Sequence, residues 1–369
     1  MTWTKQRLNN LFFILGVLAV VVMLFTFDVS FVELWQHLCH AGYWLIPIIG
    51  VWFLVYGLNA LAWQATIEGN CKDTATTQHP SPNTQHPTPN TQHPTPNTQH
   101  LPSFWRIYRL TITGYALNYA TPVGGLGGEP YRIMELSKDI DKEHATSSVI
   151  LYAMMHFFAH FWFWFVSIFI YLALVVVGDL PINSFIGTVL GIIVVFCLLA
   201  FYLFSKGYRH GLVKYVLGVV AHIPGLKKWT LRFWGRHAEA IENIDKQIAS
   251  LHGQDKGAFY KSLIFEYLSR VVQSSEVLFM LLLFGIDNGG GIGGITLTYL
   301  HSILIVAFTT LFANLIGFLP MQLGVQEGGF VLSIAALGLS AALGIFVSII
   351  CRVREIIWIV VGIGLMRLR

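Results

Sequence analysis

Charged residues are scarce in this chain. Asp, Glu, Lys and Arg make up only 11% of its 369 residues, whereas 55% are hydrophobic, and the mean hydropathy is +0.62. A soluble globule of this length needs more charge than that to cover its surface. The composition therefore excludes a soluble protein and indicates an integral membrane protein.

Cysteine is also rare, with four residues. Cys197 and Cys351 fall within apolar runs, and Cys39 and Cys71 fall in different predicted loops, so neither a disulfide framework nor a metal site is predicted. The sequence has no nucleotide-binding loop, and no cofactor is expected. The first apolar run is not followed by a small-residue cleavage site, so we interpret it as an uncleaved first span.

Six apolar runs are long enough to cross roughly 30 Å of hydrocarbon. They cover residues 11–27, 43–67, 149–177, 185–204, 259–284 and 341–366. Two further apolar pieces, 107–120 and 295–319, run directly into the loops TPVGGLGGEP (121–130) and PMQLGVQEGG (320–329). The proline and the glutamate have the same spacing in both loops, which suggests that the loops are equivalent.

The positive-inside rule orients the predicted spans. Residues 205–257 contain nine Lys or Arg and four Asp or Glu, which predicts that this segment and both termini are cytoplasmic. The basic residues can also contact anionic lipid headgroups, but a topology signal is the simpler interpretation. With both termini inside, the pieces 107–120 and 295–319 must each enter and leave the membrane at the same face. The first piece uses the cytoplasmic face, and the second piece uses the outer face.

The return path of the first odd piece is short. It covers Glu129–Leu136, which as a helix crosses less than half the bilayer. We therefore expect an all-α polytopic membrane protein with six full spans and two re-entrant helical hairpins. Its halves, residues 1–176 and 177–369, form an inverted-topology repeat.

A tandem TQHPTPN repeat interrupts the first half. Residues 77–100, within an insert over 72–102, contain no aliphatic side chain, so we expect disorder with polyproline character. Four evenly spaced histidines could suggest metal binding, but an unstructured repeat does not preorganise ligands. Deletion of the repeat is expected to be harmless.

Irregular backbone within a bilayer persists only where it lines protein or a wet cavity. We therefore predict that the two glycine-rich loops face each other across one polar site near the midplane. Glycine amides in the first loop attract an anion such as phosphate. The substrate-binding residues predicted around this loop are Asn118, Gly124, Gly125, Gly127, Gly128, Glu129 and Arg132.

The second loop and two spans complete the predicted site. Glu266, Arg270, Gln273 and Ser274 share one face of span five, and of these Glu266 and Arg270 are predicted to bind substrate. The other predicted residues are Gln322, Gln326 and Glu327 in the loop, with Arg352 and Arg354 beside Glu355 in span six. Buried charges need a partner or a function, so Glu266 with Arg270, and Glu355 with either arginine, are alternatively structural ion pairs.

Two histidines, His156 and His160, share one face of an aromatic run in span three. They either relay protons or form hydrogen bonds within an aromatic bundle, and the second interpretation is favoured.

The motif NYATPVGGLGGEPYR (118–132), followed by LPMQLGVQEGG (319–329), resembles the lysylphosphatidylglycerol synthase transmembrane-region family, also called flippase-like or AglD-like membrane proteins. The resemblance covers nearly the whole chain apart from the repeat. It implies a region that, in bifunctional relatives, is thought to move an aminoacylated phospholipid between leaflets. Because the sequence stops at Arg369, we expect a stand-alone member without the aminoacyl-transfer domain.

These observations favour a translocase for a lipid or lipid-linked glycan in the plasma membrane. Its expected partner is the membrane lipid, with a homo-oligomer or a lipid-modifying enzyme as further partners and no nucleic acid. One alternative is a membrane-embedded lipid-modifying transferase, although no catalytic constellation is recognised. Another is an accessory scaffold for such an enzyme.

Overall fold

The computed structural model describes residues 42–76, 101–120, 127–210, 256–315 and 325–367, with scattered positions between 214 and 245. Within these residues a short 3-10 helix, η1 (Gly42–Trp44), precedes nine α-helices, and there is no strand. The helices are α3 (Leu45–Thr76), α4 (Phe104–Ala120), α5 (Glu129–Leu136), α6 (Lys142–Val176), α7 (Ser184–His210), α10 (Lys256–Leu283), α11 (Gly291–Leu315), α12 (Val325–Ala336) and α13 (Ala341–Leu365). The prediction of an all-α fold is confirmed for this part of the chain.

Four of these helices, α3, α6, α7 and α11, are long and apolar enough to cross a membrane by length and composition. Helices α10 and α13 have comparable lengths, 28 and 25 residues, but carry charged side chains in the middle of the helix, such as Glu266 and Arg270 in α10 and Arg352 and Arg354 in α13. Three predictions lie outside the described residues: the first span, the TQHPTPN repeat and most of the basic segment 205–257.

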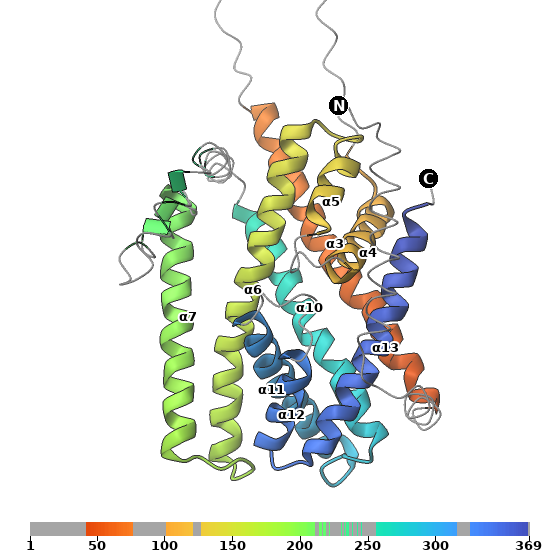
Figure 1. Cartoon of the computed structure of the whole chain (residues 1–369), viewed down its shortest axis with the longest axis vertical. Helices are drawn as coiled ribbons and strands as arrows, with labels where there is room; N and C mark the ends of the chain where they lie inside the picture. Colours follow the sequence, from red (N-terminus) through yellow and green to blue (C-terminus); the bar gives the residue numbers. More distant parts are fainter. Residues whose placement is uncertain are drawn as a thin grey trace, which may run out of the picture.

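The two hairpins lie at opposite ends of the helix bundle (Figure 1). Helices α4 and α5, here called the first hairpin, occupy the upper half of the view. Helices α11 and α12, the second hairpin, occupy the lower half, while α6, α10 and α13 run between the two ends. The short return helix expected over Glu129–Leu136 is confirmed, because α5 has these bounds. Helix α11 is longer than a hairpin arm requires, with 25 residues.

Local sequence explains where the return helices begin. Pro130 follows Glu129 at the start of α5, a position where proline needs no amide hydrogen and has the right φ. Glu129 and Glu327 lie in the first turns of α5 and α12, where a carboxylate favours the positive end of the helix dipole. The longer α6 is capped at its start by Asp141, whose side chain accepts hydrogen bonds from the Glu143 and His144 amides.

Each hairpin is packed into its own apolar cluster. Around the first hairpin, Trp63 of α3, Leu117 of α4 and Tyr131 of α5 are buried together. Around the second, Ile305 of α11 and Ile334 of α12 pack in a separate cluster with residues of α6, α10 and α13. Burial of these side chains stabilises the hairpins in the bundle and leaves their polar tips facing the region between the clusters.

Candidate functional site

A cavity of about 420 Å³ lies between the two hairpins, and we call it the central cavity. Eight helices contribute to its wall: α3, α4, α5, α6, α10, α11, α12 and α13. Six of the predicted site residues line it: Asn118, Glu129, Arg132, Arg270, Gln326 and Arg354. The tips of both hairpins therefore border one polar space.

Among the described residues, the charges on the wall of the central cavity balance. The lining includes the three arginines 132, 270 and 354 and the three glutamates 129, 276 and 355. Since charged side chains are costly to place among membrane helices, each is expected to have a partner or a role in binding. The ion pairs described next account for most of their oxygen and nitrogen atoms.

In the first hairpin, Glu129 and Arg132 form an ion pair of 2.9 Å across one turn of α5. Asn118 of α4 holds this turn in place, because its Oδ1 accepts the Gly128 amide at 2.6 Å while its Nδ2 donates to Glu129 Oε1 at 3.3 Å. The Gly128 amide, which we predicted would face an anion, therefore already has an acceptor. The second carboxylate oxygen of Glu129 is buried and has no hydrogen-bond partner within the described residues.

Two glycines allow α4 and α5 to approach this closely. A Cβ atom on Gly128 would lie 2.1 Å from the carbonyl oxygen of Gly114, and a Cβ on Gly114 would lie 2.1 Å from Arg132 Nε. Both distances are far shorter than a normal contact, so neither position accepts a side chain without movement. The glycine at 128 therefore serves the crossing of two helices.

Aromatic rings surround the Arg132 guanidinium, which is 1% exposed. Its central carbon lies 4.8 Å from the Tyr115 ring centroid, 5.3 Å from Tyr152 and 5.6 Å from Trp63. Such cation–π contacts favour the charged form of a desolvated arginine. The positive charge is thus held at the cavity wall by Glu129 and by three rings.

The second hairpin is joined to α13 by a chain of charges. Arg352 contacts Glu327 at 2.6 Å and Glu355 at 2.8 Å. Gln326 donates to Glu355 at 3.1 Å, so the first turn of α12 is fixed through both of its polar side chains. Gln326 and Glu355 line the cavity, whereas Glu327 and Arg352 lie behind them. The alternative of an ion pair between Glu355 and one of the two arginines is thus met in its geometry, with Arg352 in the shorter contact.

A second buried ion pair joins α13 to α10. Glu276 accepts from Arg354 at 2.7 Å and 3.2 Å, and it also accepts from the Trp52 indole of α3 at 2.9 Å. The Trp52 ring centroid lies 3.9 Å from the Arg354 guanidinium carbon. Both charged side chains are less than 5% exposed, so this cluster ties three helices together within the membrane region.

Elsewhere on the cavity wall, α6 and α10 meet through His156. Its ring lies 3.0 Å from Glu266 and 2.7 Å from Arg270, and these two α10 side chains pair with each other at 3.4 Å. The Arg270 Nη2 atom lies 2.7 Å from both ring nitrogens, and Nδ1 also lies 3.1 Å from the Tyr115 hydroxyl. The pair predicted between Glu266 and Arg270 is confirmed, with Glu266 fully buried behind the cavity lining.

The structure leaves part of the predicted site undescribed. Gly124, Gly125 and Gln322 lie outside the described residues, and Gly127 lies just inside them. Sequence reasoning also missed several lining residues, notably Trp52, Tyr115 and Glu276. Glu276 continues the three-residue spacing from Gln273 on α10, which was a usable signal. No comparable signal marks Trp52 or Tyr115, because they resemble any aromatic residue of a membrane helix.

The comparison with known families is decisive for the class of protein. The family described as lysylphosphatidylglycerol synthase TM region matches residues 13–364, nearly the whole chain. The chain belongs to this family. The lysylphosphatidylglycerol synthase TM region is a membrane region related to lipid handling, which agrees with the apolar helices and the expected family. No curated protein and no solved structure matches the chain.

Ligand sites are typically concave and combine apolar walls with a few well-placed polar groups. The central cavity has this form, among the helices of a family related to lipid handling. The central cavity is therefore the candidate functional site of this member.

Proposed function

We propose that this protein moves a lipid with a charged or polar headgroup between the two leaflets of the plasma membrane, with the headgroup passing through the central cavity. The observation that carries the proposal is the cavity of about 420 Å³ lined by charged residues of both hairpins. A headgroup crossing the hydrocarbon region needs polar partners along its path, and this wall supplies them. The acyl chains remain outside, in contact with lipid or with apolar protein surfaces.

The arrangement of the helices supports an inverted repeat, which is the architecture expected for a transporter. Helix α3, the first hairpin and α6 are followed by α10, the second hairpin and α13, and the second set runs in the opposite direction (Figure 1). The contacts between helices follow the same repeat. Helix α4 packs on α13 in the way that its counterpart α11 packs on α6, and α5 packs on α6 in the way that α12 packs on α13. We infer that α7 and the first predicted span complete the two halves.

The orientation follows from charge. The upper end in Figure 1 holds the C-terminal ends of α3, α7 and α13 and the N-terminal ends of α6 and α10. Basic residues near these ends include Lys138, Lys142, Lys206, Lys256 and Arg367. The turns at the lower end contain Asp179 and Asp287. By the positive-inside rule we assign the upper end, and with it the C-terminal end of α13, to the cytoplasm. The N-terminus, which lies outside the described residues, is expected on the same side from its own basic residues.

The chemistry of the wall selects the headgroup. Arg132 can exchange its contact with Glu129 for a phosphate oxygen, because both are anionic acceptors of similar geometry. The released Glu129 carboxylate, with one oxygen already without a partner among the described residues, can then accept from a hydroxyl or an amine of the same headgroup. An anionic phospholipid or glycolipid with such donors fits this exchange best.

The test is transport of fluorescent phosphatidylglycerol in vesicles reconstituted with the purified chain. We compare Glu129→Gln and Arg132→Gln with Glu143→Gln, an exposed position at the start of α6. Loss of a charge-assisted hydrogen bond should slow transport by roughly tenfold or more for the first two variants and leave the third unchanged. Size-exclusion profiles of all variants report whether folding is intact.

Unchanged transport in well-folded Glu129→Gln and Arg132→Gln proteins would contradict the proposal. Transport that is absent from every protein, together with a chemically altered lipid formed by the chain in detergent, would instead support the transferase alternative, since detergent micelles have no leaflets to cross.

A further inference from the structure

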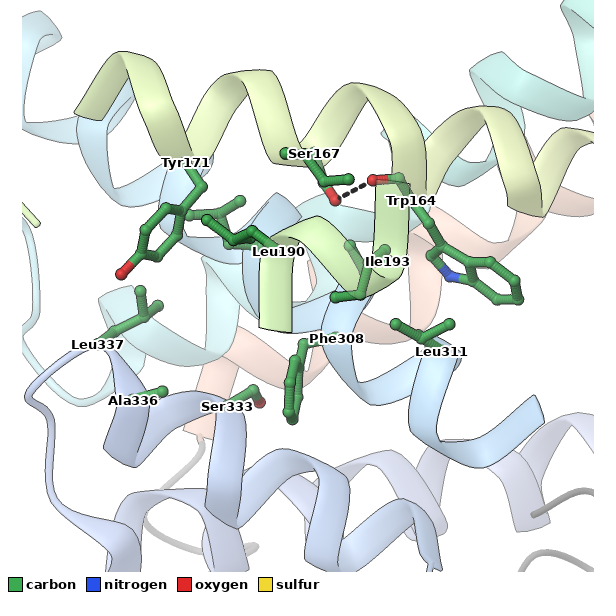
Figure 2. Close-up of a pocket in the computed structure, with 13 residues that line it drawn as sticks. Trp164, Ser167, Tyr171, Leu190, Ile193, Phe308, Leu311, Ser333, Ala336 and Leu337 are labelled. Carbon is green, nitrogen blue, oxygen red and sulfur yellow. Dashed lines mark hydrogen bonds between the residues drawn. The ribbon is translucent and has the colours of Figure 1, made fainter. Parts of the chain in front are cut away.

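A second, apolar cavity lies on the outside of the bundle, and we call it the lateral groove. It measures about 90 Å³ and is lined by residues of α6, α7 and α11 and by the end of α12. Figure 2 shows Trp164 and Leu311 at one end of the groove and Tyr171 and Leu337 at the other. Trp164 and Tyr171 are two helical turns apart on α6, so the groove is roughly 10 Å long.

The described residues that line the lateral groove offer no free polar group to a ligand. Ser167 donates to the Trp164 carbonyl at 2.7 Å, as the dashed line in Figure 2 marks, and Tyr171 donates to the Pro181 carbonyl at 2.8 Å. The Trp164 indole donates to Thr310 at 3.1 Å, and Ser333 donates to the Phe330 carbonyl at 3.1 Å. Each polar side chain of the lining therefore has a partner within the protein, and a headgroup would gain nothing there.

The size of the groove and its surroundings point to hydrocarbon. A dry apolar cavity of about 150 Å³ accepts a benzene-sized molecule, so 90 Å³ suits a short stretch of an acyl chain. Leu190, Ile193 and Phe308 are only partly buried in it, and Ala336 at its edge is exposed. On the outer side of α7, Ile192 and Val195 are 63% and 67% exposed, as expected for side chains that face lipid.

One helix separates the lateral groove from the central cavity. Thr309, Thr310 and Ala313 on one face of α11 line the cavity, while Ala307 and Leu311 on the other face line the groove. Hydrogen bonds join α11 to the helix on each side of it. The Trp164 indole of α6 donates to Thr310, and the hydroxyl groups of Thr309 and of Ser333 in α12 are 3.2 Å apart. If the contact between Trp164 and Thr310 opens, a lipid can place its headgroup on one side of α11 and one acyl tail on the other.

We propose that the lateral groove binds an acyl chain of the membrane lipid whose headgroup enters the central cavity. This inference rests on the proposed function and adds the position of the tail. Because the second hairpin lies in the lower half of the bundle (Figure 1), the bound tail belongs to the leaflet at that end, opposite the basic end. The tail is held by burial of its methylene groups, which favours apolar partners without requiring a specific headgroup.

The test uses the full chain in vesicles that contain phosphatidylglycerol with a photoreactive diazirine in one acyl chain, and peptide mass spectrometry maps the labelled residues. We expect strong labelling at Phe308 and Ile193, which line the groove. Labelling at Ile192 and Val195 reports ordinary contact with bulk lipid. The groove labels should decline when unlabelled phosphatidylglycerol is added, relative to those two reference positions.

Two neighbouring alanines provide matched variants. Ala335 and Ala336 are both exposed on α12, but only Ala336 lines the groove. Ala336→Trp should reduce labelling of Phe308 and Ile193 by roughly tenfold, as expected when about two methylene groups lose their burial, and Ala335→Trp should leave it unchanged. If Ala336→Trp does not fold, Leu190→Trp on α7 fills the same groove from the other side.

Equal labelling of Ile193 and Val195, with no effect of either filling variant, would overturn the groove proposal. The labelling does not require transport, so the two proposals can fail separately. Groove labelling that persists in a Glu129→Gln protein supports tail binding whether or not this substitution stops lipid movement.

Discussion

The buried ion pair between α10 and α13 permits a quantitative prediction about stability. Glu276 and Arg354 are 3% and 4% exposed and contact each other through two hydrogen bonds, of 2.7 Å and 3.2 Å. Removing one partner leaves the other charge buried without its main compensation, which typically costs about 3–5 kcal/mol. We therefore expect Glu276→Gln and Arg354→Gln each to lower the free energy of unfolding by an amount in this range.

Removing both charges should cost much less than the sum of the two single substitutions. The double variant leaves no uncompensated charge, and replacing a buried pair by neutral side chains is often close to neutral. Glu355, at 3.8 Å from Arg354, offers the arginine only a longer contact, so it cannot substitute fully for Glu276. A double-mutant cycle should therefore give a coupling free energy of about 2 kcal/mol or more.

The assay is reversible unfolding in lipid–detergent bicelles, followed by loss of helical circular dichroism, for the parent chain and the three variants. Single substitutions that each cost less than about 1 kcal/mol and add without coupling would refute the assignment of this pair as a structural tie between α10 and α13.

Three further predictions follow from local geometry. Gly128→Ala should destabilise the protein by about 1–3 kcal/mol through its clash with the Gly114 carbonyl, while Gly191→Ala on α7, which has open space around it, should be neutral or stabilising by up to about 1 kcal/mol in the same unfolding assay. Asp141→Asn should reduce stability only at neutral pH: partial burial acts to raise the pKa of Asp141, but hydrogen bonds from the His144 amide and ring and from the Glu143 amide hold that pKa below its ordinary value. The stabilisation is thus present above the ordinary pKa of an aspartate and is lost as the pH falls through the lowered one, so the parent and the variant should converge in acid. Deletion of residues 77–100 should leave expression, stability and lipid transport unchanged, and a loss of any of them would contradict the prediction that the repeat has no structural role.

Local features of the fold could be predicted from the sequence. The bounds of α5 follow from the glycines before Glu129, from Pro130 after it and from the polar residues after Leu136. The pair of Glu266 and Arg270 follows from helical spacing, because residues four apart lie on one face.

Contacts between distant segments could not be predicted in the same way. Glu276 and Arg354 are 78 residues apart, and no spacing rule connects them. The Gly128 amide was expected to bind an anion. Because α4 and α5 cross there, it instead donates to the side chain of Asn118, ten residues earlier. The chain folds these polar groups against one another before any ligand arrives.

The central claim, that the tips of both hairpins border one cavity, can be tested by crosslinking. Tyr119 of α4 and Asn314 of α11 both line the cavity. In a chain whose four cysteines are replaced by alanine and whose segment 246–255 carries a protease site, we introduce Tyr119→Cys with Asn314→Cys and add a short bismaleimide. The account predicts that the two fragments stay joined after cleavage, whereas Tyr119→Cys with Ile292→Cys, at the 88% exposed start of α11 and about 33 Å along the helix from Asn314, gives free fragments. Fragments that separate in the first pair, although each cysteine reacts with a monofunctional maleimide, would contradict it.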